Sequence, residues 1–211
     1  HITIVPLPNV SGGADQTLFS GTQTTLSATG ASSYTWTGGV VNAQPFTAVT
    51  SQYYSVSGTD TNGCVNTAIV HITANPLPII NAGPDVSVCK GNYVSLNALS
   101  NANVSWNNGV INNLAFYPQT SNGYVATATN SYGCKKTDTV VVTVNPLPIV
   151  NAGVDQTICS STSTTLHATG ATTYNWSNGV HDGIVFTPAS THQYTVTGTD
   201  SNGCINKDSV L

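Results

Sequence analysis

The chain has 211 residues and a formal net charge of -4, and 6% of its residues are charged, against about 25% in ordinary soluble domains. It contains no Glu, Arg or Met, and its 4 basic residues are all Lys. Such a surface offers no basic patch for a phosphate backbone, and no apolar run approaches the roughly 20 residues of a membrane span. We therefore expect no nucleic-acid partner and no membrane insertion.

A period of 70 residues runs through the whole sequence. Its clearest copies are Tyr54–Cys64 (YSVSGTDTNGC), Tyr124–Cys134 (YVATATNSYGC) and Tyr194–Cys204 (YTVTGTDSNGC). Self-similarity at a fixed period is typical of tandem domains. We expect repeat 1 at 9–75, repeat 2 at 79–145 and repeat 3 at 149–211, joined by Pro-Leu-Pro linkers at 76–78 and 146–148.

The first residues repeat the end of a domain rather than its start. His1–Pro8 matches His71–Pro78, so 1–8 is predicted to be the end of a preceding repeat's closing strand with its linker. At the other end, Leu211 is equivalent to Val141 inside the closing strand of repeat 2, so the closing strand of repeat 3 is expected to be truncated. The sequence therefore predicts a segment of a longer array.

Each repeat is predicted to be all β, because apolar and polar residues alternate and no window has the apolar spacing of a helix. In chain order, repeat 3 has predicted strands at 156–159, 164–169, 173–177, 183–188 and 194–199, and a closing strand after Cys204. Repeat 2 shows the closing strand most clearly, at 136–144. Asn178 and Gly179 form a strong turn signal after the third strand.

Short strands with frequent turns and one central Trp are typical of a small immunoglobulin-type sandwich. The predicted fold class is therefore all-β, a tandem array of three immunoglobulin-like β-sandwich domains. A Tyr at the start of the sixth strand is placed as the tyrosine corner of such sandwiches, its ring in the core and its hydroxyl bonded to nearby backbone. The predicted core anchors are Trp36, Trp106 and Trp176 together with Tyr54, Tyr124 and Tyr194.

The linkers contain no flexible Gly or Ser. A Pro-x-Pro segment favours the extended polyproline conformation and acts as a semi-rigid spacer. Consecutive repeats are therefore expected to align end to end in a stiff rod.

The five cysteines occupy two places in the repeat, and Cys64 shares the second place with Cys134 and Cys204. Cys89 and Cys159 lie in the first strand of their repeats, and Cys134 and Cys204 follow the last turn. If both places lie at the same pole of the domain, the disulfides are Cys89–Cys134 and Cys159–Cys204. Each closes a 46-residue loop, worth roughly 4 kcal/mol by the chain-entropy estimate. Disulfides also predict an oxidising, extracellular setting.

Cys64 has no partner in this scheme, because Phe19 stands where repeats 2 and 3 have cysteine. Two interpretations stay open. Cys64 is either a buried free thiol beside Phe19 or a covalent link to another molecule.

The repeats resemble the PKD-like and immunoglobulin-like repeats of large surface adhesins secreted by gliding bacteria. The segments that carry the resemblance are Asn81–Asp85 (NAGPD), Asn151–Asp155 (NAGVD), Thr173–Gly179 (TYNWSNG), Phe186–Pro188 (FTP) and Tyr194–Cys204. The resemblance covers the whole chain. It implies a secreted, multi-domain stalk or fibre, in some cases adhesive, with no catalytic site.

Acidic residues recur at the start and the last turn of the repeats. Asp15, Asp60, Asp155 and Asp200 could supply oxygen ligands for Ca²⁺ at a domain junction. Alternatively, the turn residues bond to turn backbone and the first-strand residues cap entry loops. Repeat 2 has Asn130 at the turn position, which favours the second interpretation. We expect no other metal or cofactor.

A second function class is carbohydrate binding through exposed aromatic residues. The outward or loop candidates are Tyr53, Tyr93, Tyr117 and Tyr132, which do not follow the period. Surface glycans would then be the partner. An enzyme is not expected, because no Gly-x-Ser-x-Gly elbow or other catalytic motif occurs.

Thr139 and Ser209 lie in Asp-Thr-Val and Asp-Ser-Val triplets, which resemble O-glycosylation acceptor sites of related bacteria. The prediction from the sequence is a structural stalk or fibre segment of a long extracellular surface protein. Its expected partners are further repeats of the same protein, with identical chains in a filament or surface glycans as alternatives.

Overall fold

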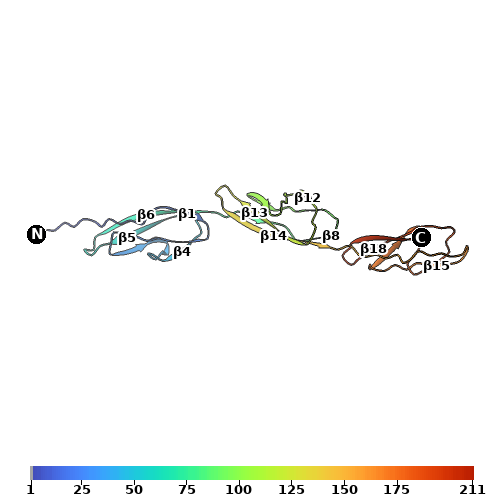
Figure 1. Ribbon diagram of the computed structural model, residues 1–211. Helices are drawn as coiled ribbons and strands as arrows, with labels where there is room; N and C mark the ends of the chain where they lie inside the picture. Colours follow the sequence, from blue (N-terminus) through green and yellow to red (C-terminus); the bar gives the residue numbers. More distant parts are fainter. Residues whose placement is uncertain (1) are drawn as a thin grey trace. The chain divides into compact units, whose positions relative to one another are not determined.

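The structure is a computed structural model that describes residues 2–211 (Figure 1). The chain is nearly all β, with two one-turn 3-10 segments, η1 (Thr37–Gly39) and η2 (Ser177–Gly179), among the described residues. No helix in 2–211 is long and apolar enough to cross a bilayer.

Repeat 1 is a sandwich of two sheets. Its strands are β1 (Gln16–Phe19), β2 (Thr22–Thr25), β3 (Ser33–Trp36), β4 (Pro45–Ala48), β5 (Gln52–Thr59) and β6 (Val65–Asn75). One sheet has the order β1-β6-β5-β3 and the other pairs β2 with β4. Strands β5 and β6 alternate buried and more exposed residues, as expected for sheets with one face on the core.

The first strand of repeat 1 runs parallel to the last. Gln16 lies opposite Ile72 and Phe19 lies opposite Asn75, whereas β5 and β6 are antiparallel. The residues of β1 therefore lie beside the far end of the closing strand, ten residues from its start at Val65. This parallel register decides which cysteines can meet.

Repeat 2 has the same framework. Its strands are β7 (Ile80–Asn81), β8 (Val86–Cys89), β9 (Val94–Ser95), β10 (Leu99–Ser100), β11 (Asn103–Trp106), β12 (Ala115–Phe116), β13 (Asn122–Thr129) and β14 (Lys135–Asn145). The main sheet has the order β11-β13-β14-β8, with β8 parallel to β14 and Cys89 opposite Asn145. The smaller sheets pair β12 with β9 and β10 with β7.

Repeat 3 keeps three of these five strand pairings, and an isolated bridge between Asn151 and Thr169 stands where repeat 2 pairs β7 with β10. Its strands are β15 (Thr164–Thr165), β16 (Thr173–Trp176), β17 (Val185–Phe186), β18 (Tyr194–Thr199) and β19 (Ile205–Val210). The sheets are β16-β18-β19 and β15-β17. The predicted strand at 156–159 is irregular here, although β1 and β8 occupy the equivalent positions in repeats 1 and 2.

The chain forms two compact units. The first unit comprises His1–Ile80, Ser100–Val104 and Thr127–Thr137, and the second comprises Asn81–Leu99, Ser105–Ala126 and Asp138–Leu211. Repeat 2 contributes to both units. Repeat 1 belongs wholly to the first unit and repeat 3 to the second.

The core of each repeat is built from the residues that the period shares. In repeat 1, Leu26, Trp36, Tyr54, Val56 and Ile72 are buried together. The equivalent cluster of repeat 3 contains Leu166, Trp176, Val196 and Val210, with Tyr194 partly buried against it. Tyr124 is also buried, and Trp106 is half-buried.

The turn predicted at Asn178 and Gly179 is present, and both residues have positive φ, 57° and 70°. Glycine and asparagine tolerate this conformation best. The turn does not close a hairpin between neighbouring strands, because β16 pairs with β18 and β17 pairs with β15. It moves the chain from one sheet of the sandwich to the other.

Candidate functional site

A disulfide joins repeat 2 to repeat 3 within the second unit. Cys89, the last residue of β8, is bonded to Cys204, which lies just before β19, and their Cα atoms are 5.5 Å apart. Cys204 is fully buried. The bond spans 115 residues of sequence, so it restricts a much longer loop than a bond inside one repeat would.

The predicted pairs Cys89–Cys134 and Cys159–Cys204 are therefore wrong. Cys134 and Cys159 are free thiols in the structure. The reason is the parallel register, which puts Cys89 opposite Asn145 while Cys134 precedes Lys135 at the other end of β14. Ten residues of strand separate these ends, about 33 Å, and a disulfide needs Cα atoms less than about 7 Å apart.

The observed bond follows a simple rule: a first-strand position pairs with the residue 115 further along the chain. Applied to the first unit, this rule pairs Phe19 with Cys134, and both belong to that unit. Phe19 cannot form the bond, which explains why Cys134 is buried but free. It is thus Cys134, and not Cys64, that loses its partner to Phe19. Cys64 is half-buried and Cys159 is exposed.

The acidic residues at the start of each repeat accept hydrogen bonds from the closing strand. Oδ1 of Asp15, Asp85 and Asp155 accepts the backbone N–H of His71, Val141 and Leu211, at 2.8 to 2.9 Å. These bonds lie where the parallel pairing of first and last strand begins. Asp15 and Asp155, two of the candidate calcium ligands, therefore bond to backbone N–H groups. This is the type of role that the alternative interpretation predicts for them.

The residues before the last turn also bind backbone. Oδ1 of Asp60 accepts the N–H groups of Asn62 and Cys64, and Asp200 binds Asn202 and Cys204 in the same way. In repeat 2 the amide oxygen of Asn130 makes the equivalent bonds. An uncharged amide suffices for this role. Among 2–211, no three His, Cys, Asp or Glu side chains converge as a metal site.

A polar residue six positions after each Trp holds the indole in place. Trp36 Nε1 donates to Oδ1 of Asn42 at 3.0 Å, and the same oxygen accepts the N–H of Ala28 at 2.7 Å. Asn112 does the same for Trp106 and Ala98. This residue follows the period, at positions 42, 112 and 182. Its role was not predicted from the sequence, because the residue type changes from Asn to Asp at position 182.

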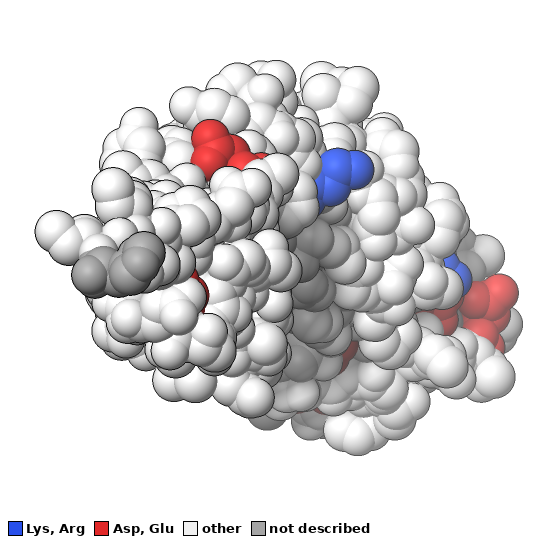
Figure 2. Space-filling view, turned by 90° about the vertical axis from the view of Figure 1, so that its left-hand side faces the viewer, with Lys and Arg blue, Asp and Glu red and all other residues white. Residues whose placement is uncertain are grey.

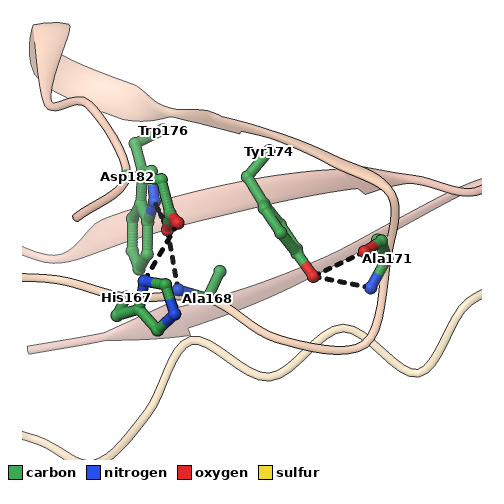
Figure 3. A network of polar contacts seen from close by, with 6 residues as sticks. All are labelled: His167, Ala168, Ala171, Tyr174, Trp176 and Asp182. Atoms are coloured by element: carbon green, nitrogen blue, oxygen red, sulfur yellow. Dashed lines mark hydrogen bonds and ion pairs between the residues drawn. The ribbon is translucent and has the colours of Figure 1, made fainter.

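In repeat 3 the holding residue is Asp182, shown in Figure 3 with its partners. Its Oδ1 accepts from Trp176 Nε1 at 2.9 Å and from Ala168 N at 2.7 Å, and its Oδ2 lies 3.1 Å from His167 Nδ1. A His–Asp pair supplies two of the three members of a hydrolytic triad. Here the carboxylate is committed to the indole and the backbone, so its geometry serves to join strands.

In repeats 1 and 3, a tyrosine other than the predicted one makes the hydroxyl bond to backbone, and repeat 2 has Val104 at this position. Tyr34 Oη accepts the N–H of Ala31 and donates to its carbonyl, and Tyr174 does the same with Ala171 (Figure 3). Tyr54, Tyr124 and Tyr194 instead pack their rings on Phe46, Phe116 and Phe186, with centroids 5.1 to 5.3 Å apart. Their rings therefore pack in or against the core as predicted. The predicted bond from their hydroxyls to nearby backbone is wrong: among residues 2–211, the tyrosine hydroxyls that bond to backbone are those of Tyr34 and Tyr174.

Charged side chains are sparse on the face that Figure 2 shows. The aromatic candidates for sugar binding are exposed: Tyr53 stacks on His71 with centroids 4.2 Å apart, and Tyr93 meets Tyr117 edge to face at 5.7 Å. Tyr132 is 60% exposed. Of the two glycosylation candidates, Thr139 is exposed and Ser209 is half-buried, its Oγ accepting a bond from Gln193.

Each linker is bonded to the repeat that follows it. Nδ2 of Asn66 and Asn206 donates to the carbonyl oxygens of Pro8 and Pro148, at 2.9 and 3.0 Å. In repeat 2, Asn130 Nδ2 donates to Pro76 O at 2.8 Å. The second proline of every linker is buried. These bonds restrict the start of each repeat without any side-chain charge.

No family model and no curated protein matches the chain. Solved structures that resemble it include Sidekick-1 immunoglobulin domains 1-5 (14% identity, 99% of this chain and 58% of that one, TM-score 0.32). Others are titin domains A168-A170 (14%, 97% and 96%, 0.36) and Drosophila N-cadherin EC1-4 (14%, 93% and 71%, 0.30). The chain thus spans little more than half of the Sidekick-1 fragment, and similarity at this level assigns neither family nor function.

The assignment of fold rests on the strands themselves. Each repeat has a main sheet that contains the closing strand, a small second sheet, and a Trp on the third strand facing the core. The chain is a tandem array of immunoglobulin-like β-sandwich repeats.

Proposed function

We propose that the chain is a structural segment of a long extracellular bacterial surface protein, a stalk or fibre built from these repeats. The observation that carries the proposal is the Cys89–Cys204 disulfide. It connects the first strand of one repeat to the last turn of the next. A disulfide in this place joins two repeats and therefore resists the separation of consecutive domains, a role that does not exist in a protein of one domain.

The bond also makes the second unit harder to unfold. The chain-entropy estimate for a loop of this length is about 5 kcal/mol, which is a large part of the stability of a small domain. The bonds from Asn66, Asn130 and Asn206 to linker carbonyls add local restraint. Both features favour a stiff rod whose task is mechanical.

An extracellular setting is supported by the chemistry of the cysteines. Disulfides persist in oxidising compartments and are rare in the cytosol. The sequence also resembles PKD-like repeats of adhesins from gliding bacteria, which are secreted. The surface of Thr, Ser and Asn residues with little charge has no strong repulsive field, and so suits packing of repeats against one another.

Antibody labelling of source cells tests the proposal. Antibodies raised against the chain should label intact cells without permeabilisation, and electron microscopy should show the label along surface fibres. Labelling that requires lysis of the cells would contradict it. An antibody against a cytosolic protein is the matched control.

Carbohydrate binding is a second candidate, favoured by the exposed rings of Tyr93 and Tyr117 in repeat 2. Aromatic rings stack on sugar faces, and the pair is not repeated in repeats 1 and 3. Binding on a glycan array that is lost in Tyr93→Ala but kept in Tyr132→Ala would support this role. An array without signal would leave the stalk alone.

A further inference from the structure

The disulfide between Cys89 and Cys204 decides which residues carry tension along this part of the chain. A pull on the backbone before Cys89 and after Cys204 passes through the S–S bond, because this bond is the shortest covalent connection between the two sides. Residues 90–203 form a closed loop beside this route. The loop contains the core residues Trp106 and Trp176, so tension does not run through the cores of repeats 2 and 3.

The parts of the second unit that do carry tension are mainly extended strands. β8 ends at Cys89, and β19 begins directly after Cys204. A strand rises about 3.3 Å per residue, which is close to the roughly 3.3 to 3.6 Å of a fully stretched chain. These two strands therefore have almost no length to release when the chain is pulled.

Without the bond, tension would act on the parallel pairing of first and last strand in repeat 2. β8 and β14 lie side by side from Val86 opposite Val142 to Cys89 opposite Asn145. The chain enters the repeat before β8 and leaves it after β14, so a pull draws the two strands in opposite directions. The hydrogen bonds of this short ladder are far weaker than a covalent bond. Once the ladder slides apart, the repeat opens and its chain extends.

Repeat 1 has the same parallel pairing without the disulfide. β1 pairs with β6 from Gln16 opposite Ile72 to Phe19 opposite Asn75. Phe19 stands where a bond to Cys134 would close the equivalent loop, and Cys134 is a free thiol. In the 211-residue chain, tension therefore runs through the whole of repeat 1. This repeat is an internal reference for a sandwich that hydrogen bonds alone hold against a pull.

The disulfide withholds a large amount of length. The two cysteines are 115 residues apart in sequence, but their Cα atoms are 5.5 Å apart in space. Fully stretched at roughly 3.3 to 3.6 Å per residue, the same stretch of chain would span about 400 Å. Repeat 1, at 9–75, would release only about 200 Å by the same estimate. The two contributions can therefore be told apart by length.

We propose that the Cys89–Cys204 disulfide is a covalent bypass, which carries tension past the cores of repeats 2 and 3 and fixes the length of this part of the stalk. The inference rests on the proposed function, because only a chain under tension uses a bypass. Forced unfolding is governed by the rate of unfolding, so this role differs from the equilibrium stabilisation that the bond also gives. The bypassed repeats stay folded while the stalk is pulled.

Reduction of the bond returns the loop to the route of tension. A thiolate attacks the sulfur of Cys89, which is half-buried, and Cys204, which is fully buried, leaves as a thiolate. A second thiol then resolves the mixed disulfide. In total, two thiols of the reagent are oxidised to one disulfide, and the two cysteines take up the electrons and protons. A thiol reagent such as dithiothreitol is thus a switch for the bypass that leaves the sequence unchanged.

Single-molecule stretching of the 211-residue chain, held by handles at its two ends, tests the proposal. The oxidised chain, with the bond verified by peptide mapping, should lengthen by about 200 Å as repeat 1 opens and then no further. Dithiothreitol, or the double variant Cys89→Ala with Cys204→Ala, should add about 400 Å at forces that the oxidised chain withstands. Hydrogen exchange without load verifies that the variant is folded before it is pulled.

Cys64→Ser with Cys159→Ser is the matched control, because it removes two free thiols and keeps the bond. Its curves should equal those of the native chain before and after reduction. Two results would overturn the proposal. One is an oxidised chain that lengthens by the full amount of all three repeats. The other is a reduced chain that lengthens no more than the oxidised chain over the same range of force.

Failure of the stalk function gives a different pattern. If antibodies do not label intact cells but the two stretching curves differ as expected, the stalk is contradicted and the bypass is supported. If the cells are labelled but the oxidised chain extends fully, the stalk function is retained and the bypass is removed.

Discussion

The two compact units contain the same pair of positions, 115 residues apart, and fill them differently. In the second unit these are Cys89 and Cys204, which are bonded, and in the first they are Phe19 and Cys134, which are not. Parallel pairing of first and last strand is present beside Phe19 as it is beside Cys89. The sandwich thus forms without the bond, and the disulfide strengthens a framework that the strands already specify.

Removal of the bond should have the largest effect. Replacement of Cys89 and Cys204 by Ala should lower the free energy of unfolding of the second unit by up to about 5 kcal/mol, because the unfolded chain regains the entropy of a long loop. Hydrogen exchange followed by mass spectrometry, peptide by peptide, should show the loss in the second unit only. Cys64→Ser is the control, and an equal loss in both units would contradict the comparison.

The reverse change should make the first unit like the second. Phe19→Cys should form an intrachain disulfide with Cys134 and stabilise the first unit by about 2 to 4 kcal/mol, since engineered bonds often give less than the entropy estimate. Peptide mapping without reduction identifies the bond. The double variant with Cys134→Ala removes the partner and should lose the gain. A bond from the introduced cysteine to Cys64 instead would show that the register does not transfer.

The Trp-holding residue should matter in both units, but the ion pair in only one. Asn42→Ala leaves the Trp36 and Ala28 N–H groups without their acceptor, at a cost of about 2 to 4 kcal/mol. Asp182→Asn keeps the acceptor and loses only the contact with the exposed His167, at a cost below about 1 kcal/mol. Urea unfolding followed by Trp fluorescence measures both, and equal losses would contradict this ranking.

The smallest effect concerns acid. Hydrogen bonds from the backbone N–H groups of Ala152 and Ser209 lower the pKa of Asp208 below its ordinary value, whereas repeat 1 has Ala68 there. A lowered folded-state pKa stabilises the fold above the unfolded pKa, and this is lost as pH falls through the folded value. Asp208→Asn should therefore make repeat 3 less sensitive to acid as the pH falls below the ordinary Asp pKa of about 4. Exchange rates of repeat 3 peptides measured against pH give the test; an unchanged pH profile would contradict it.

Much of the fold could be predicted from the sequence, since alternation and the period of 70 residues place the strands around Trp36 and Trp176. The cysteine pairing could not, because no local pattern says whether the first strand runs parallel or antiparallel to the last. The choice moves Cys89 from one end of β14 to the other. The role of Tyr34 was missed for another reason: the bond of its hydroxyl to Ala31 recurs at Tyr174 and Ala171, but repeat 2 has Val104 at this position and breaks the period.

All acidic residues of the chain are Asp, and each accepts at least one backbone N–H bond within its own repeat. Carboxylates in this protein therefore act as fixed parts of the scaffold rather than as the source of its solubility. In a library of random substitutions, Asp positions should tolerate change poorly, while the neighbouring Thr and Ser positions on the outer faces should accept Lys or Glu freely. The chain can thus be recharged for purification, immobilisation or display without altering its architecture.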